Sequence, residues 1–213
     1  MEKEEQQESY TRRQKLEMLF KQSRLGERFR SCTFDNYPRI PETEHIYMAL
    51  SDYTDSFSQN RNKSILLLSH PGTGKTYLAS CVVNRLVSVG IAAIFIVVPD
   101  LLNQIRATYD KSNRETEERI MYGLVEADLL VLDDIGAERH RDKEDWGTEK
   151  LYSIINSRYN NMKATIFTTN CSMKELADKL GDRTFSRICE MTEGLRFEMN
   201  NVKDFRLKDF YKR

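Results

Sequence analysis

Several features that would assign this chain to a special protein class are missing from its sequence. The 33 basic and 33 acidic residues give a formal net charge of zero, so no overall field draws the chain to nucleic acid, and any such contact needs a local patch. No apolar run approaches the roughly 20 residues of a membrane-spanning helix, and no internal repeat is present. These absences favour an ordinary globular domain with a short appendage.

Cysteine and histidine are scarce as well, and neither is clustered. The four cysteines show no CxxC spacing, and no pair of histidines lies near them (Cys32, Cys81, Cys171 and Cys189). This arrangement argues against a zinc site and a disulfide framework. Because reduced, buried thiols are typical of the cytosol, and because residues 1–7 are polar and acidic, we expect a cytoplasmic protein.

One segment has the pattern of a phosphate-binding loop. Residues 65–76 read ILLLSHPGTGKT, a strand of buried type followed by a glycine-rich turn. The two glycines allow backbone N–H groups to point inward. Lys75 can then reach the terminal phosphates, and the Thr76 hydroxyl can face Mg²⁺. The pattern has glycine at its first position, where this chain has Ser69, so Ser69 needs a backbone conformation that tolerates a β-carbon.

The residues after the loop support this interpretation. Apolar side chains recur at helical spacing over residues 77–89, and the positive N-terminal end of that helix would face the phosphates. A chance loop would explain neither the strand before it nor the helix after it. The residues predicted to bind the nucleotide are Gly72, Thr73, Gly74, Lys75, Thr76 and Tyr77.

A second apolar strand, Leu129–Leu132, runs into two acidic residues. Fully buried strands read as continuous apolar runs, and ligands bind at the carboxyl ends of such strands. Asp133 can therefore hold Mg²⁺ opposite Thr76, and Asp134 can polarise a water molecule. A third strand ends in Asn170 at the same edge. Solvated turn acids and a capping asparagine are the alternatives, and the combination of all three strand ends favours a site.

Strand and helix patterns alternate along the chain, which predicts a parallel α/β sheet flanked by helices. A β-branched strand closed by Pro99 precedes Asp100, which is expected to cap a helix that starts at Leu101. Further along, Ser172 and Glu175 have the spacing of a capping box.

Five short segments occur in an order that matches one family. They are Cys32–Tyr37 (CTFDNY), the loop 69–76, Asp133–Glu138 (DDIGAE), Thr168–Asn170 (TTN) and Leu180–Arg183 (LGDR). As an ordered set they resemble the AAA+ ATPases of the DnaC/DnaI helicase-loader and IstB family. The resemblance implies a P-loop AAA+ core that binds ATP and Mg²⁺ and self-assembles, so that a neighbour's arginine completes each site. It also implies a hexameric replicative helicase as partner, delivered onto single-stranded DNA.

The same resemblance assigns roles within the site. Lys75, Thr76 and Asp133 match the nucleotide and Mg²⁺ positions, and Asn170 matches sensor 1. Asp134 stands where most AAA+ proteins have glutamate. One methylene less shortens its reach by roughly 1–1.5 Å, and a misplacement of that size can cost about 10²-fold in rate. Either Glu138 assists Asp134, or hydrolysis is slow.

Three arginines match positions that contact phosphates in the family. Arg187 matches the arginine finger that acts on the neighbouring subunit, and Arg183, one turn earlier, is the competing candidate. Arg206 resembles the sensor 2 arginine. An isolated arginine more often makes a surface ion pair, so these roles rest on the match of position.

The start of the chain departs from the family. Loaders carry a helicase-binding domain ahead of the AAA+ core, whereas 31 residues precede Cys32 here. We divide the chain into an N-terminal extension with a linker helix, residues 1–31, and an AAA+ ATP-binding domain, residues 32–213. Either the sequence is part of a longer chain, or a charged helix predicted over residues 10–24 engages the partner alone.

A local basic stretch is the candidate DNA contact. Arg106, Tyr109 and Lys111 place an aromatic ring among cations, which can stack a base while neutralising phosphates. In the family this region lines a central channel. A solvated helix end with Tyr109 half buried is an equal alternative. Residues 139–145 mix basic with acidic side chains and predict only a solvated loop.

Three functions stay open on these grounds. The first is an ATP-hydrolysing loader, from host or phage, that places a DnaB-type helicase on single-stranded DNA. The second is an IstB-type ATPase that regulates transposition. The third is an ATP-dependent scaffold with little hydrolysis.

Overall fold

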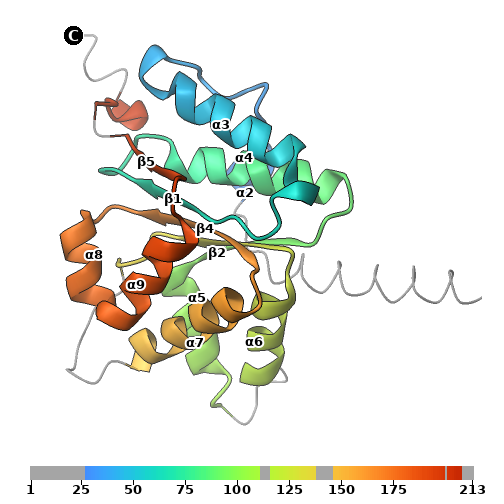
Figure 1. Ribbon diagram of the computed structural model, residues 1–213, viewed down its shortest axis with the longest axis vertical. Helices are drawn as coiled ribbons and strands as arrows, with labels where there is room; N and C mark the ends of the chain where they lie inside the picture. Colours follow the sequence, from blue (N-terminus) through green and yellow to red (C-terminus); the bar gives the residue numbers. More distant parts are fainter. Residues whose placement is uncertain (1–26, 111–115, 138–145, 200, 208–213) are drawn as a thin grey trace, which may run out of the picture.

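The structure is a computed structural model that describes residues 27–110, 116–137, 146–199 and 201–207. The helix predicted over residues 10–24 and the charged loop 139–145 lie outside these ranges. A parallel five-stranded sheet organises the described chain, in the order β2-β3-β4-β1-β5 (Figure 1). The strands are β1 (Ile65–Leu68), β2 (Ala93–Val97), β3 (Leu129–Asp133), β4 (Ala164–Thr169) and β5 (Arg196–Glu198).

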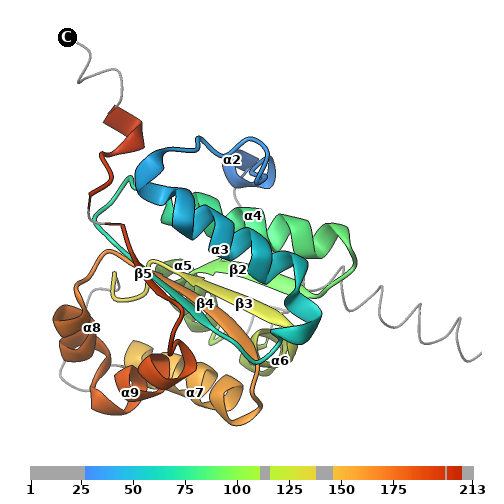
Figure 2. The ribbon, with the colours of Figure 1, turned by 45° about the horizontal axis from the view of Figure 1, so that its top comes forward.

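Helices cover both faces of the sheet, which confirms the predicted α/β architecture. One face carries α2 (Glu27–Arg30), α3 (Glu44–Asp55) and α4 (Lys75–Ser88), and Figure 2 shows these helices above the strands. The other face carries α5 (Val98–Ala107), α6 (Glu117–Glu126), α7 (Trp146–Asn160), α8 (Met173–Leu180) and α9 (Asp182–Met191). Short 3-10 turns complete the described elements: η1 (Pro41–Thr43), η2 (Phe57–Gln59) and η3 (Phe205–Leu207). No helix in the described ranges has the length and apolar character needed to cross a membrane.

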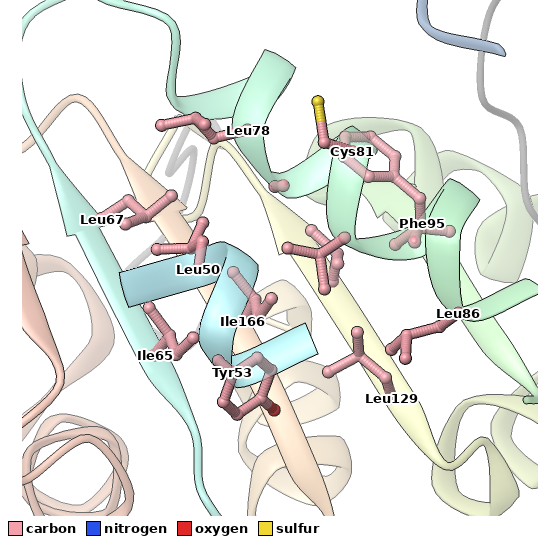
Figure 3. Close-up of a cluster of buried hydrophobic side chains, with 14 of the residues drawn as sticks. Leu50, Tyr53, Ile65, Leu67, Leu78, Cys81, Leu86, Phe95, Leu129 and Ile166 are labelled. Atoms are coloured by element: carbon pink, nitrogen blue, oxygen red, sulfur yellow. The ribbon is translucent and has the colours of Figure 1, made fainter. Parts of the chain in front are cut away.

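Successive side chains along each strand belong alternately to two separate hydrophobic cores. Ile65 and Leu67 of β1 point to α3 and α4, where Figure 3 shows them beside Leu50 of α3. Leu66 and Leu68 belong to the core on the opposite face. Since successive side chains of a strand point to opposite faces, a strand covered on both sides must be apolar throughout. This explains the continuous apolar runs in the sequence.

The sheet order brings three strand ends to one edge. β4 lies between β3 and β1, and Leu68 of β1 pairs with Thr169 of β4. Because all the strands are parallel, the loop after β1, the acids at the end of β3 and Asn170 after β4 come together. The position of the site therefore follows from the topology.

One helix start differs from the prediction at Pro99. The helix α5 begins at Val98, one residue after β2 ends, and Asp100 lies in its first turn without forming a side-chain cap. Proline is well tolerated in the first turn of a helix, where its missing N–H has no partner to lose. The predicted capping box of Ser172 and Glu175 is confirmed, with Ser172 Oγ accepting from Glu175 N at 3.3 Å.

A buried arginine joins three elements at the end of the sheet opposite the loop after β1. Arg158 of α7 is fully buried. Its guanidinium donates to the backbone oxygens of Leu124, Val125, Ala127 and Ala164 and to Thr165 Oγ1. Three of these carbonyls lie at the C-terminal end of α6, where a cation also complements the helix dipole. Burial lowers the pKa of Arg158 to about 9.

Candidate nucleotide-binding site

The loop between β1 and α4 forms one wall of a cavity of about 290 Å³. Gly72 and Gly74 have φ angles of 83° and 99°, the left-handed conformations that glycine adopts without strain. All six residues predicted to bind the nucleotide line this cavity, together with Asp134, Asn170 and Arg206. The structure thus places these side chains around one space, with the N-terminus of α4 facing it.

Ser69, the departure at the first loop position, has a structural role. Its backbone lies outside the left-handed region, so a β-carbon is tolerated, as expected. The side chain is almost completely buried, and its Oγ donates to Met199 O at 2.8 Å. Ser69 therefore links the start of the loop to the residue that follows β5, through a bond that glycine could not make.

Lys75 lies at the centre of the site and is almost fully buried. Its ammonium donates to the backbone oxygens of Ser69 and His70 at 2.7 and 2.9 Å, and to Asn170 Oδ1 at 2.9 Å. Burial lowers the pKa of Lys75 to about 8, although Asp134 and Asp133 act in the opposite direction. An anion bound beside this ammonium favours its charged form and raises the pKa again.

Asp133 sits behind the cavity wall, where two threonines hold its carboxylate. Thr76 Oγ1 donates to Asp133 Oδ1 at 3.0 Å, and Thr168 Oγ1 donates to the same oxygen at 2.7 Å. Burial raises the pKa of Asp133 to about 6, and the neighbouring Asp134 adds to the rise. The carboxylate and the Thr76 hydroxyl form an all-oxygen donor set, which suits a hard cation such as Mg²⁺.

Asp134 and Asn170 are joined at the mouth of the site. Asn170 Nδ2 donates to Asp134 Oδ1 at 2.8 Å, and Asn170 Oδ1 accepts from Lys75. The amide thus bridges the cation and the acid. The backbone of Asp134 is left-handed, with φ of 58°, an uncommon conformation that aspartate and asparagine tolerate better than most residues.

The segment before η1 supplies an aromatic wall that sequence reasoning did not assign to the site. Phe29, Tyr37 and Pro38 line the cavity. Tyr77 OH donates to Asn36 O at 3.0 Å, which attaches this segment to α4. The aromatic residues of this stretch were visible in the sequence, but nothing in their spacing indicated that the chain passes the loop.

The end of the described chain forms a further wall. Phe205 N donates to Gly72 O at 2.9 Å, and a β-carbon added at Gly72 would lie 1.9 Å from Asp204 Oδ1. Asp204 Oδ1 accepts from Arg206 N at 2.8 Å. Glycine at position 72 is thus needed for the close approach of this segment as well as for its φ angle. This contact places Arg206 at the cavity.

The two finger candidates lie on α9, and neither lines the cavity. Arg187 is half-buried: its Nε donates to Asn156 Oδ1 at 2.8 Å, and its guanidinium lies 5.0 Å from the ring centre of Tyr152. Arg183 is exposed. These contacts hold Arg187 against α7.

The candidate DNA contact is an exposed cluster at the end of α5. Tyr109 is 56% exposed, which agrees with a solvated helix end as well as with a DNA contact. Its hydroxyl donates to Glu117 Oε2 at 2.9 Å and accepts from Trp146 Nε1 at 3.0 Å. The guanidinium of Arg106 lies 4.9 Å from the Trp146 ring centre. Lys111, the third predicted DNA contact, lies outside the described residues, as does the candidate helper Glu138.

Comparisons with known proteins agree with this geometry. A family model described as IstB-like ATP-binding protein matches residues 2–190. The replicative helicase loader DnaC of Buchnera aphidicola subsp. Baizongia pistaciae is 30% identical over 176 residues, or 82% of this chain and 70% of the relative. The replicative helicase loader DnaC of Escherichia coli (strain K12) is 30% identical over 184 residues, or 85% of this chain and 72% of the relative.

A solved structure extends the likeness to three dimensions. The crystal structure of the DnaC helicase loader aligns with a TM-score of 0.70 at 29% identity, and the match covers 84% of this chain and 100% of that one. The P-loop AAA+ fold expected from the sequence is confirmed by this match together with the sheet order.

Proposed function

This chain belongs to the family of IstB-like ATP-binding proteins, and on that premise we propose that it hydrolyses ATP with Mg²⁺ to load a replicative helicase onto single-stranded DNA. The observation that carries the proposal is the continuous hydrogen-bonded chain Lys75–Asn170–Asp134 beside the Thr76–Asp133 pair. It unites a cation, a metal-binding pair and a candidate base at the edge of the sheet where ligands bind.

Lys75 and the start of α4 hold the phosphates in this proposal. The inward N–H groups of the loop and the helix dipole attract the anion. The ammonium then exchanges its bonds to the Ser69 and His70 carbonyls for bonds to phosphate oxygens. Arg206 adds a second positive charge from the C-terminal segment.

Thr76 and Asp133 would hold Mg²⁺, which when bound draws negative charge away from the phosphate oxygens. The Thr76 hydrogen already points to the carboxylate of Asp133. Its oxygen lone pairs therefore stay available to a cation, so Thr76 can keep its bond to Asp133 while it serves as a metal ligand.

Asp134 would orient the attacking water and accept its proton. Asn170 fixes one carboxylate oxygen through its amide, which leaves the other oxygen for the water. A general base in this position contributes typically 10²–10⁴-fold to a rate. We propose that turnover is slow, because aspartate has a shorter reach than the glutamate found in most AAA+ proteins.

A replicative helicase is the proposed partner because two relatives that match most of this chain are named replicative helicase loaders. We further propose that the protein acts in the cytoplasm, that Arg106, Tyr109 and Lys111 contact single-stranded DNA, and that subunits assemble through a shared ATP site. The division into an extension, residues 1–31, and an ATP-binding domain, residues 32–213, also stays a proposal.

Affinity capture with ATP in the source organism tests the function. The tagged chain should retain a hexameric helicase, and Lys75→Ala should lose that capture together with ATP binding, since it removes the cation of the loop. Unchanged ATP affinity and turnover in Lys75→Ala, measured by calorimetry and phosphate release, would end the assignment of the site.

A transposition regulator is the second candidate, because the matched family model is described as IstB-like. The same capture separates the two functions: a transposase in place of a helicase would favour the second. Turnover that is undetectable with and without single-stranded DNA would favour an ATP-dependent scaffold.

A further inference from the structure

Thr168 touches both acids at the end of β3, and the proposed chemistry has not yet used it. It is the fifth residue of β4 and is completely buried. Its Oγ1 donates to Asp133 Oδ1 at 2.7 Å and accepts from Asp134 N at 3.0 Å. The pairing of β3 with β4 ends one residue earlier, at Leu132 and Phe167. One hydroxyl therefore bridges the two acids just beyond the paired part of the strands.

The direction of this hydroxyl is determined by its two partners. A carboxylate only accepts hydrogen bonds and a backbone N–H only donates them, so the hydrogen of Thr168 Oγ1 must point to Asp133 and a lone pair to Asp134. Threonine is β-branched and stiff about its first side-chain torsion. The bridge therefore restrains the carboxylate of Asp133 at the same oxygen that accepts from Thr76.

The same residue supports the unusual backbone of Asp134. A non-glycine residue with φ of 58° persists only when its surroundings hold it there. Thr168 contributes two of the contacts that do so: Oγ1 accepts from Asp134 N, and its carbonyl accepts from Ile135 N at 2.9 Å. Removal of the hydroxyl takes away the side-chain acceptor of the Asp134 N–H.

We propose that Thr168 is a positioning residue that aims Asp133 at the metal and holds Asp134 toward the terminal phosphate. The inference rests on the proposed function, since it presumes that Asp133 binds Mg²⁺. Groups that hydrogen-bond to metal ligands typically alter metal affinity or activity by about 10–100-fold when they are removed. A change of that size is expected here.

The test is a Mg²⁺ titration of ATP binding by the full chain. Thr168→Val keeps the shape of the side chain and removes the hydroxyl. It should raise the Mg²⁺ concentration for half-saturation by about 10–100-fold, while ATP affinity in EDTA stays within threefold of the wild type. Thr168→Ser keeps the hydroxyl and should restore most of the Mg²⁺ affinity.

Thr192→Val is the matched control, because Thr192 is also fully buried and its hydroxyl donates to Ile188 O at 2.7 Å, away from the site. It should leave the Mg²⁺ midpoint unchanged. Circular dichroism establishes that each variant is folded. If the valine variant does not fold, Thr168→Ala, which lacks the same hydroxyl, takes its place with the same expected shift.

Two results would overturn the inference. One is a Mg²⁺ midpoint within threefold of wild type in a folded variant without the hydroxyl, and the other is an equal shift in Thr192→Val. Failure of the proposed Mg²⁺ site gives a different pattern, because the wild-type protein would then bind ATP equally with and without Mg²⁺, whereas failure of helicase loading appears in the affinity capture.

Discussion

The conformation of Asp134 gives a physical reason for its departure from glutamate. A left-handed φ of 58° is tolerated by aspartate and asparagine, whose short polar side chains form local hydrogen bonds, more readily than by longer residues. Asn170 then holds the carboxylate at 2.8 Å. The shorter side chain is thus matched to the turn, although its reach is reduced.

Asp134→Asn should abolish hydrolysis while ATP still binds. Asparagine has the same shape and accepts the same backbone conformation, so the change removes only the charge and the basicity. We expect a loss of about 10²–10⁴-fold in single-turnover hydrolysis, with ATP affinity near wild type by filter binding. Asp134→Glu, which adds reach, should increase the rate. A rate that survives the asparagine substitution would transfer the role to Glu138.

Lys75 should make nucleotide binding depend on pH. Its pKa of about 8 in the free protein must rise when phosphates bind, since an anion favours the charged form. Affinity is therefore fully present below pH 8 and falls as the pH rises above it, by up to about tenfold per pH unit. Calorimetry without Mg²⁺ between pH 7 and 9.5 measures this slope. A flat wild-type profile would contradict the pKa.

At the scale of elements, Arg158 should determine stability without affecting the site. It joins α6, α7 and β4 through five hydrogen bonds at the end of the sheet opposite the loop after β1. Arg158→Lys keeps the charge but leaves several buried carbonyls without a hydrogen-bond donor. Each unpaired carbonyl costs about 1–3 kcal/mol. Urea unfolding should show a loss of at least about 3 kcal/mol.

The control for this prediction is Arg61→Lys, because Arg61 is exposed and makes a surface ion pair with Asp128 at 3.6 Å. Surface pairs contribute little, about 0–1 kcal/mol, so its stability should hardly change. ATP affinity of Arg158→Lys, measured below its unfolding transition, should equal that of the wild type. A stable Arg158→Lys protein would show that the buried network is dispensable.

At the scale of the whole molecule, Arg187 tests whether the active site is shared. Arg187→Ala should bind ATP normally and lose most assembly-dependent turnover, since an arginine finger is worth about 10³–10⁵ in rate where it operates fully. Mixing it with Lys75→Ala should restore activity, because each variant supplies what the other lacks. Phosphate release from the mixture is the measurement.

The exposed Arg183 is the counterpart in that experiment, because it lies one turn earlier on α9 and is the competing candidate for the finger. Arg183→Ala should have the milder defect. A larger defect at Arg183, or no rescue on mixing, would move the finger one turn back along α9 or remove it.

Short-range patterns in the sequence were enough to predict the class of fold and the residues of the loop that line the cavity. The apolar strands, the glycine-rich loop, Asp133 and Asn170 are local signals, and parallel strands bring such ends to one edge. The start of α5 was misjudged because proline is compatible both with the end of a strand and with the first turn of a helix.

Only the tertiary structure decided the features that depend on contacts between distant segments. Asp204 against Gly72, Phe29 and Tyr37 in the cavity wall, and Thr168 between the two acids all join residues far apart in the chain. Arg158 likewise reads as an ordinary charged helix residue until the carbonyls around it are known. Composition and periodicity indicate which apolar side chains are buried. The choice of polar partners is made by packing, since each buried donor must find an acceptor within about 3 Å.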